Sequence, residues 1–349
     1  MAVNDLSSQN VIADAVALEA RLTEPRPALI DALSAIEGDI LILGAGGKMG
    51  PTLATLAAKA TAASGSSRKV IAVSSWSKPG LRERLESAGV HTIAANLLEP
   101  AALEALPDAA NLIYMVGRKF GSSGAEWSTW TTNVWLAGQV ARRFIDSRVV
   151  MFSSGNIYPF VDVTSGGATE AMAPAPVGEY AMSCLGRERM FDHAANELGA
   201  KVLQYRLNYA VELRYGVLLD VAKKVWRQEP IDLSMGYFNC VWQGYANEVA
   251  LRGLALAASP PAILNVTGPE TVSVRALAAQ FGKLLDREPR FQGQESGSAL
   301  LSNASRCFEY FGKPEVTLEL LTQWTAAWVR QGGDTLDKPT HFETRDGKY

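Results

Sequence analysis

The stretch that decides the fold is DILILGAGGKMGPT, residues 39–52. Four aliphatic residues, 40–43, form a short apolar run, which is typical of a parallel strand covered by helices on both faces. Glycines at positions 44, 47 and 50 follow, and a helix-forming stretch begins after Pro51. Glycine lets a strand turn tightly into a helix and lets backbone N–H groups approach a pyrophosphate. The stretch therefore predicts a dinucleotide-binding turn at a helix N-terminus.

Similar apolar runs recur along the chain, and helical stretches lie between them. The runs are Val70–Val73, Val90–Ala94, Leu112–Val116, Val149–Phe152, Val202–Tyr205 and Ile263–Val266. The helical stretches include Thr52–Ala63, Ala101–Ala105, Trp130–Arg143 and Ser273–Leu285. Strands that alternate with helices imply right-handed crossovers. We therefore expect an α/β fold, a Rossmann-type doubly wound parallel sheet.

The pattern also suggests how the chain is divided. Residues 1–37 are expected to form an N-terminal helical appendage of two short helices. Residues 38–210 are expected to form the nucleotide-binding domain, which also receives 241–268. Residues 211–240 and 269–349 are expected to form a smaller, discontinuous C-terminal substrate lobe and a polar tail. That tail is either loose or folded over a cleft.

Composition excludes several classes of protein. The 349 residues are 48% hydrophobic and 20% charged, and the net charge of −3 favours neither nucleic acid nor an anionic membrane as a partner. No run reaches the roughly 18–20 apolar residues that a membrane helix needs. Three cysteines without a CxxC pair favour the reducing cytoplasm. Three scattered histidines predict no metal site.

The end of the second strand bears on the choice of coenzyme. A carboxylate there would bind the adenosine ribose hydroxyls and repel a 2′-phosphate. This chain has Ser74 and Ser75 at that place instead, and the nearest cations are Lys48, Arg82 and Arg84. The pattern leans toward NADP over NAD. The alternative, which is the commoner case, is that the two arginines belong to a solvated helix face.

Several short motifs follow one another in a specific order. After the glycine turn come Asn96-Leu97-Leu98, Asn133-Val134, Phe152–Tyr158, Thr169-Glu170, Glu179–Ser183, Arg206-Leu207-Asn208 and Asn265–Gly268. Across about residues 38–290 the chain resembles the extended short-chain dehydrogenase/reductase superfamily, in its NAD-dependent epimerase/dehydratase group. The resemblance implies an NAD(P)-dependent oxidoreductase or epimerase that acts on a secondary alcohol of a sugar or sugar derivative.

The resemblance also assigns roles to residues. Ser154 would hydrogen-bond the reacting oxygen, and Tyr180 would act on it as general acid and base. The expected coenzyme-binding residues are Gly44, Gly47, Lys48, Met49, Gly50, Ser74, Ser75, Asn96, Leu97, Val116 and Gly117. The expected substrate-binding residues are Arg118, Asn156, Asn208 and Trp242. A homodimer through a two-helix face is common in the family, and residues 1–37 leave that arrangement open here.

One position departs from the family pattern. A lysine normally follows the tyrosine by four residues, where it lowers the phenol pKa and holds the nicotinamide ribose, but Cys184 stands there. A phenol alone, with a pKa near 10, is a poor base at neutral pH. Three interpretations remain open: Arg118 or Lys119 supplies the cation, Tyr180 is not the main base, or the site binds nucleotide without turnover. The last describes a catalytically weakened regulatory or scaffold protein of the same fold.

Overall fold

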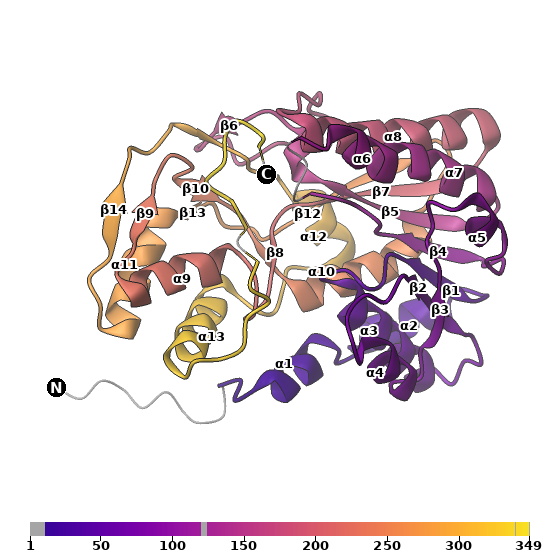
Figure 1. Ribbon diagram of the computed structural model, residues 1–349, viewed down its shortest axis with the longest axis horizontal. Coiled ribbons are helices and arrows are strands. Elements are labelled where there is room, and N and C mark those ends of the chain that lie inside the picture. The colour runs from indigo at the N-terminus through magenta and orange to yellow at the C-terminus, as the bar shows by residue number, and fades with distance from the viewer. Residues whose placement is uncertain (1–10, 120–123, 339, 349) are drawn as a thin grey trace.

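The computed structural model describes residues 11–119, 124–338 and 340–348. A seven-stranded parallel sheet forms the centre of the larger lobe, with strand order β12-β7-β5-β4-β1-β2-β3 (Figure 1). The strands are β1 Ile40–Leu43, β2 Val70–Ser74, β3 His91–Ala94, β4 Asn111–Tyr114, β5 Arg148–Ser154, β7 Lys201–Leu207 and β12 Ala262–Val266. Every apolar run named above contributes a strand, and the predicted doubly wound fold is confirmed.

The sheet is apolar on both faces because successive side chains of a strand point to opposite sides. In β1, Ile40 and Ile42 belong to one buried cluster, and Leu41 and Leu43 belong to the other. The first cluster is covered by α1 Ala15–Leu22, α2 Pro27–Ser34, α3 Gly50–Ala63, α4 Leu81–Ser87 and α10 Gln243–Arg252. The second is covered by α5 Pro100–Glu104, α7 Leu136–Arg143 and α8 Glu179–Leu198.

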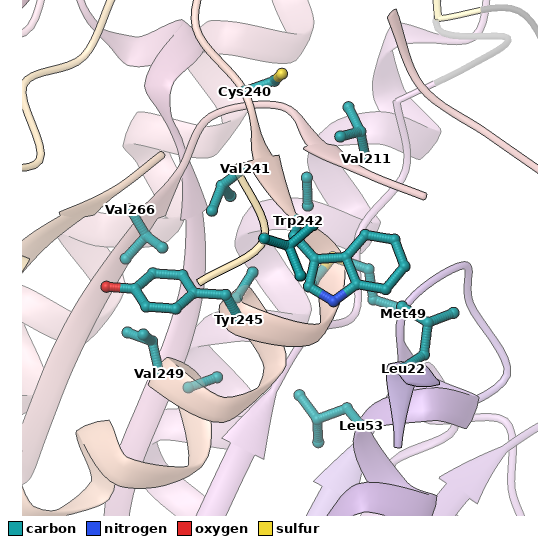
Figure 2. Packing of buried hydrophobic residues seen from close by; sticks show 14 of the residues in the cluster. Leu22, Met49, Leu53, Val211, Cys240, Val241, Trp242, Tyr245, Val249 and Val266 are labelled. Carbon is teal, nitrogen blue, oxygen red and sulfur yellow. The ribbon is translucent and has the colours of Figure 1, made fainter. Parts of the chain in front are cut away.

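The two N-terminal helices are part of this core. Figure 2 shows Leu22 of α1 beside Met49 and Leu53, with the Trp242 indole packed against the same group. Just after α1, the Arg26 guanidinium makes two hydrogen bonds to Glu248 on α10, at 2.5 and 2.7 Å. Apolar burial and this ion pair fix the N-terminal helices to the first face of the sheet.

A smaller lobe lies beside the sheet and is built from helices and short strand pairs (Figure 1). Its helices are α9 Val217–Arg227, α11 Val274–Leu285, α12 Ser305–Phe311 and α13 Leu318–Arg330. The pairs are β6 Val161–Asp162 with β15 Ser298–Ala299, β8 Ala210–Val211 with β11 Val241–Trp242, β9 Pro230–Asp232 with β14 Arg290–Gln292, and β10 Tyr237–Phe238 with β13 Val272–Ser273. The predicted helix at 273–285 is confirmed, with Ser273 as its N-cap.

The stretch predicted as one helix over 130–143 is interrupted. It consists of α6 Glu126–Trp130, a π-helical turn η1 Thr131–Trp135, and α7. The Asn133 side chain is buried within this turn and donates 2.8 Å to the Ser183 hydroxyl on α8. A π turn carries an extra residue per turn and often marks a functional site.

The C-terminal segment runs back between the two lobes toward α8 (Figure 1). Leu336 N donates to the Arg214 carbonyl, and the Thr340 hydroxyl donates 2.6 Å to Asp220 on α9. Phe342 is buried against the smaller lobe. Of the two alternatives for the tail, the structure therefore shows the folded one. No helix in the described ranges is long and apolar enough to cross a bilayer.

Candidate active site

The glycine turn joins β1 to α3 at the point where the order of the sheet reverses. Gly44 has φ +87°, and a Cβ there would lie 2.9 Å from the Val116 backbone nitrogen. A Cβ on Gly50 would lie 2.4 Å from the Ala45 carbonyl oxygen. Both positions therefore require glycine. No side chain caps the first N–H groups of α3, so these donors fit the pyrophosphate of a dinucleotide.

The residues after β2 lie beside this turn. A Cβ on Gly46 would come 2.3 Å from the Ser74 hydroxyl oxygen, so Ser74 packs directly on the glycine loop. Ser75 is exposed, and the Trp76 indole donates 2.9 Å to the Ile93 carbonyl. Arg82 pairs with Glu86 on an exposed helix face, as the solvated alternative expected.

The positions after β3 are arranged differently. Asn96 is exposed and its side chain bonds Glu99, whereas Leu97 is buried in the second apolar cluster. Neither lines the cavity described next. Their expected contact with coenzyme stays a prediction.

A cavity of about 270 Å³ opens at the carboxyl ends of the central strands. Eight predicted site residues line it: Lys48, Met49, Gly117, Lys119, Ser154, Asn156, Tyr180 and Asn208. Residues that were not predicted complete the wall, among them Arg187, Tyr215 and Thr340. The cavity thus adjoins the glycine turn, the start of α8, the start of α9 and the C-terminal tail.

Ser154 and Tyr180 meet in this cavity. Ser154 is the last residue of β5, and Tyr180 is the second residue of α8. The Ser154 hydroxyl hydrogen-bonds the phenol oxygen, which lowers the phenol pKa, but burial acts more strongly and leaves that pKa well above its usual value. The pair is placed to share one oxygen of a ligand, provided that a cation stabilises the phenolate.

Cys184 cannot supply that cation. Its side chain is 1% exposed, and burial raises the pKa of its thiol, so the thiol is neutral near pH 7. The Tyr180 hydroxyl hydrogen-bonds the thiol, and this contact raises the phenol pKa further. The residue at the lysine position therefore opposes ionisation of the tyrosine.

Of the two cations proposed from the sequence, only Lys119 reaches the cavity. Its Nζ lies 5.8 Å from the centroid of the Tyr180 ring, and burial lowers its pKa to about 8. Arg118 instead donates 3.0 Å to the Ser128 hydroxyl and does not line the cavity. Its expected contact with substrate finds no support in this arrangement.

Arg187 is a cavity residue that sequence reasoning missed. It is 5% exposed and lies seven residues after Tyr180, which is two turns along the same face of α8. Nη1 donates 2.7 Å to the Phe152 carbonyl, and Nη2 donates 2.9 Å to Asn133 Oδ1. The signal that could have found it is this seven-residue spacing.

Lys48 reaches from the glycine turn into the same cavity. Its Nζ donates 2.7 Å to the Ala210 carbonyl and lies 4.2 Å from the centroid of the Tyr215 ring. Burial lowers its pKa to about 7, against the smaller opposing effect of Glu212. The ammonium is therefore poised between its charged and neutral forms, and it is available to an anion at the turn.

Two further predictions have different outcomes. Asn208 lines the cavity, and its amide donates 2.6 Å to Asn239. The expected role of Trp242 in substrate binding is wrong, because its indole is 4% exposed and packs in the core beside Leu22 and Met49 (Figure 2). Its ring centroid also lies 5.7 Å from that of Trp324. Trp242 lies in β11, which pairs with β8, and it does not line the cavity.

Comparisons with known proteins were made at the level of sequence and of structure. No family model matches the chain, and a search of curated proteins finds no similar sequence. Solved structures do share the fold. UDP-glucose 4-epimerase from Thermotoga maritima, with UDP-glucose, superposes with a TM-score of 0.67 at 17% identity, covering 84% of this chain and 99% of that one.

Two other enzymes show the same similarity. dTDP-glucose 4,6-dehydratase from Streptomyces venezuelae, with NAD bound, gives a TM-score of 0.69 at 17% identity, covering 84% of this chain and 97% of that one. UDP-glucuronic acid 4-epimerase from Bacillus cereus, in complex with NAD, gives 0.67 at 16% identity, covering 84% and 99%. The expected resemblance is confirmed at the level of the fold.

Proposed function

We propose that the protein is an NAD(P)-dependent oxidoreductase or epimerase acting on a secondary alcohol of a nucleotide-linked sugar. The observation that carries this proposal is the meeting of Ser154 and Tyr180 in the cavity that adjoins the glycine turn. The similar structures are named as sugar-nucleotide epimerases and a dehydratase, and two of them contain NAD. A nicotinamide held here would accept a hydride from the carbinol carbon.

The chain's own residues would hold the reactants and move the proton. Gly44, Gly47 and the first N–H groups of α3 would bind the pyrophosphate. Ser154 would hold the substrate oxygen, and Tyr180 would take its proton as the carbon–hydrogen bond breaks. Asn156 and Asn208 line the same cavity and are suited to bind sugar hydroxyls. Fixing both reactants in one geometry supplies much of the acceleration.

For the coenzyme, we propose NADP rather than NAD. Ser74 and Ser75 follow β2 where a carboxylate would repel a 2′-phosphate. Burial is the largest cause that lowers the pKa of nearby Lys78, and the positive charges of Lys338, Arg214 and Arg84 lower it further. A phosphate dianion would relieve this mutual repulsion. We expect NADPH to bind about tenfold more tightly than NADH, and Lys78→Ala to remove most of the difference.

The activity is tested by binding and turnover together. Calorimetric titration with NAD(H) and NADP(H) measures binding, and incubation with UDP- and dTDP-linked hexoses, followed by coenzyme absorbance and product chromatography, measures chemistry. We expect submillimolar coenzyme binding and turnover of at least one sugar nucleotide. Tight binding without turnover across the panel would support the regulatory or scaffold alternative. No binding of any dinucleotide would refute the proposal.

We further propose a homodimer in the cytoplasm. Trp127 on α6, Trp135 on η1 and Met182 on α8 are exposed, by 74, 44 and 37%. They lie on adjoining helices, which is the two-helix face expected to meet a second copy. Light scattering at micromolar concentration would show a dimer, and Trp127→Glu would convert it to monomer.

The three cysteines are buried free thiols, which suits a reducing compartment such as the cytoplasm.

A further inference from the structure

Buried arginines in this protein divide into two kinds. Arg206 is 3% exposed and pairs with Glu188 at 2.8 Å, and the less buried Arg26 and Arg214 also have carboxylate partners. Arg187 is as deeply buried as Arg206, yet it makes no ion pair with any residue in the described ranges. A buried cation without a counter-charge is costly unless something else stabilises it.

The Arg187 guanidinium is held by neutral acceptors. Nε donates 3.3 Å to the Asn133 carbonyl, and the other two bonds go to the Phe152 carbonyl and Asn133 Oδ1. These three bonds use three of the five N–H donors of a guanidinium. The π turn η1 presents both acceptor atoms of Asn133 to the one side chain. The group is therefore rigid and retains donor capacity at the cavity wall.

The guanidinium also lies against the backbone at the end of β4. A Cβ on Gly117 would come 2.8 Å from Nη2 and 3.5 Å from Nη1. A larger residue at position 117 would therefore displace the guanidinium from this place. Since the glycine turn follows the neighbouring strand β1, a dinucleotide with its pyrophosphate on that turn would extend along the carboxyl edge of the sheet toward Gly117 and Tyr180.

We propose that Arg187 supplies the fixed positive charge of this active site, binding the nicotinamide ribose and stabilising the Tyr180 phenolate in place of a lysine at position 184. This inference rests on the proposed function. The charge of Arg187 lowers the pKa of both Tyr180 and Cys184, which places it within electrostatic reach of the phenol. Its free donors suit the vicinal hydroxyls of a ribose.

Lys119 has a different role from Arg187. It approaches the face of the Tyr180 ring, and its pKa of about 8 means that it exchanges a proton near neutral pH. A guanidinium remains charged throughout that range. Arg187 is therefore the permanent cation, and Lys119 is a group whose charge varies with pH.

The test compares ligands that do and do not reach the proposed ribose site. Calorimetry measures binding of NADPH or NADH, whichever binds more tightly, and of ADP, which ends at the pyrophosphate. Arg187→Met removes the charge, and Arg187→Lys keeps it. Arg189→Met on the same helix is the matched control, because Arg189 is exposed and pairs only with Asp192 among the described residues. Cys184→Lys combined with Arg187→Met returns a cation to the neighbouring turn.

We expect Arg187→Met to weaken dinucleotide binding at least tenfold, as for loss of charged hydrogen bonds, and to leave ADP binding within about twofold. Arg187→Lys and Arg189→Met should bind the dinucleotide within about threefold of the unchanged protein. The double variant should recover most of the loss, which a purely structural arginine would not show.

Three results would overturn the inference: unchanged dinucleotide binding in a folded Arg187→Met variant, equal weakening of ADP, or no recovery in the double variant. If Arg187→Met fails to fold, Arg187→Lys decides the question, because a lysine titrates at about pH 10. Its dinucleotide-to-ADP affinity ratio should fall between pH 9 and 11, and a flat ratio would contradict the proposal. Failure of the proposed function is distinct, since the unchanged protein would then bind no dinucleotide.

Discussion

Two buried arginines, Arg187 on α8 and Arg206 on β7, have different kinds of partner. Arg206 binds both carboxylate oxygens of Glu188 and donates 2.7 Å to the Tyr158 hydroxyl, and the Ser153 hydroxyl completes the network at Glu188. Arg187 comes one residue before Glu188 but faces the cavity and binds only neutral acceptors. A buried cation that is paired with a carboxylate of the same chain, such as Arg206, stabilises the fold. A buried cation that has only neutral acceptors, such as Arg187, is the one that we propose to act on ligands.

The largest expected effect concerns Arg206, the arginine that is paired with a carboxylate. Arg206→Met leaves the buried Glu188 carboxylate without a counter-charge, with only the Ser153 hydroxyl still bonded to it, so the free energy of unfolding should fall by about 3–5 kcal/mol. Urea denaturation followed by tryptophan fluorescence measures the change. Coenzyme affinity of the folded fraction should stay within about threefold. A loss below about 1 kcal/mol would show that the pair does not stabilise the fold and would break the comparison.

The role proposed for Arg187 is tested at Tyr180, whose phenol it would stabilise. Tyr180→Phe removes the proton donor and acceptor, so turnover should fall by about 10²–10⁴-fold. Coenzyme affinity and the melting temperature should barely change, because the phenol ring remains. Steady-state kinetics with the best sugar nucleotide gives the rate. Turnover within about threefold of the unchanged enzyme would mean that another group moves the proton.

Lys48 extends the comparison to a third cation, which is half-buried. Its pKa is about 10.5 when unfolded and about 7 when folded, so between these values the unfolded chain binds more protons and stability rises with pH. Below about pH 7 both states are protonated and the slope vanishes. We expect a slope of up to about 1.4 kcal/mol per pH unit from pH 7.5 to 9, which Lys48→Met should remove.

The same titration should appear in coenzyme binding. A pyrophosphate at the glycine turn favours the charged form of Lys48, so NAD should bind about 5–10-fold more tightly at pH 6.5 than at pH 8.5. Glu212 and Arg214 are the charged groups that face Lys48 and affect its pKa in opposite directions. Calorimetry across this range, with Lys48→Met as control, makes the measurement. Equal slopes in both proteins would assign the effect to Lys119 instead.

The smallest expected effect concerns position 184 itself. Cys184→Lys restores the family's residue but places a second cation beside Arg187, and like charges at short distance oppose one another. Turnover should therefore rise by no more than about threefold, although the same substitution rescues Arg187→Met. A tenfold gain in the unchanged background would show that Arg187 does not already supply the charge.

The sequence predicted the fold well because apolar runs and glycine spacing are local signals. All the predicted strands formed, since a parallel strand buried on both faces must be continuously apolar. Ser154 and Tyr180 were assigned from the resemblance to the family, whose motifs match short contiguous stretches of this chain. Their meeting follows from topology, since the carboxyl ends of parallel strands share one edge.

Other features of the site lacked a local signal. Trp242 ends the two-residue strand β11, whose partner β8 could not be predicted from the chain, and its indole is buried in the core. Thr340 enters the cavity from the far end of the chain because the tail is held by Asp220. Contacts across 120 residues or more leave no periodicity in the sequence that would reveal them.

The sequence by itself determined the sheet, the glycine turn, the serine and tyrosine, and the absence of a lysine at position 184, because all are set by spacing along the chain. Only the tertiary structure points to Arg187 as the cation that we propose in that lysine's place. Electrostatics depends on distance and burial rather than on order in the chain. In the sequence, Arg187 and Arg206 are both simply arginines. In the structure, Arg206 lies beside the Glu188 carboxylate and Arg187 lines the cavity, and these surroundings distinguish them.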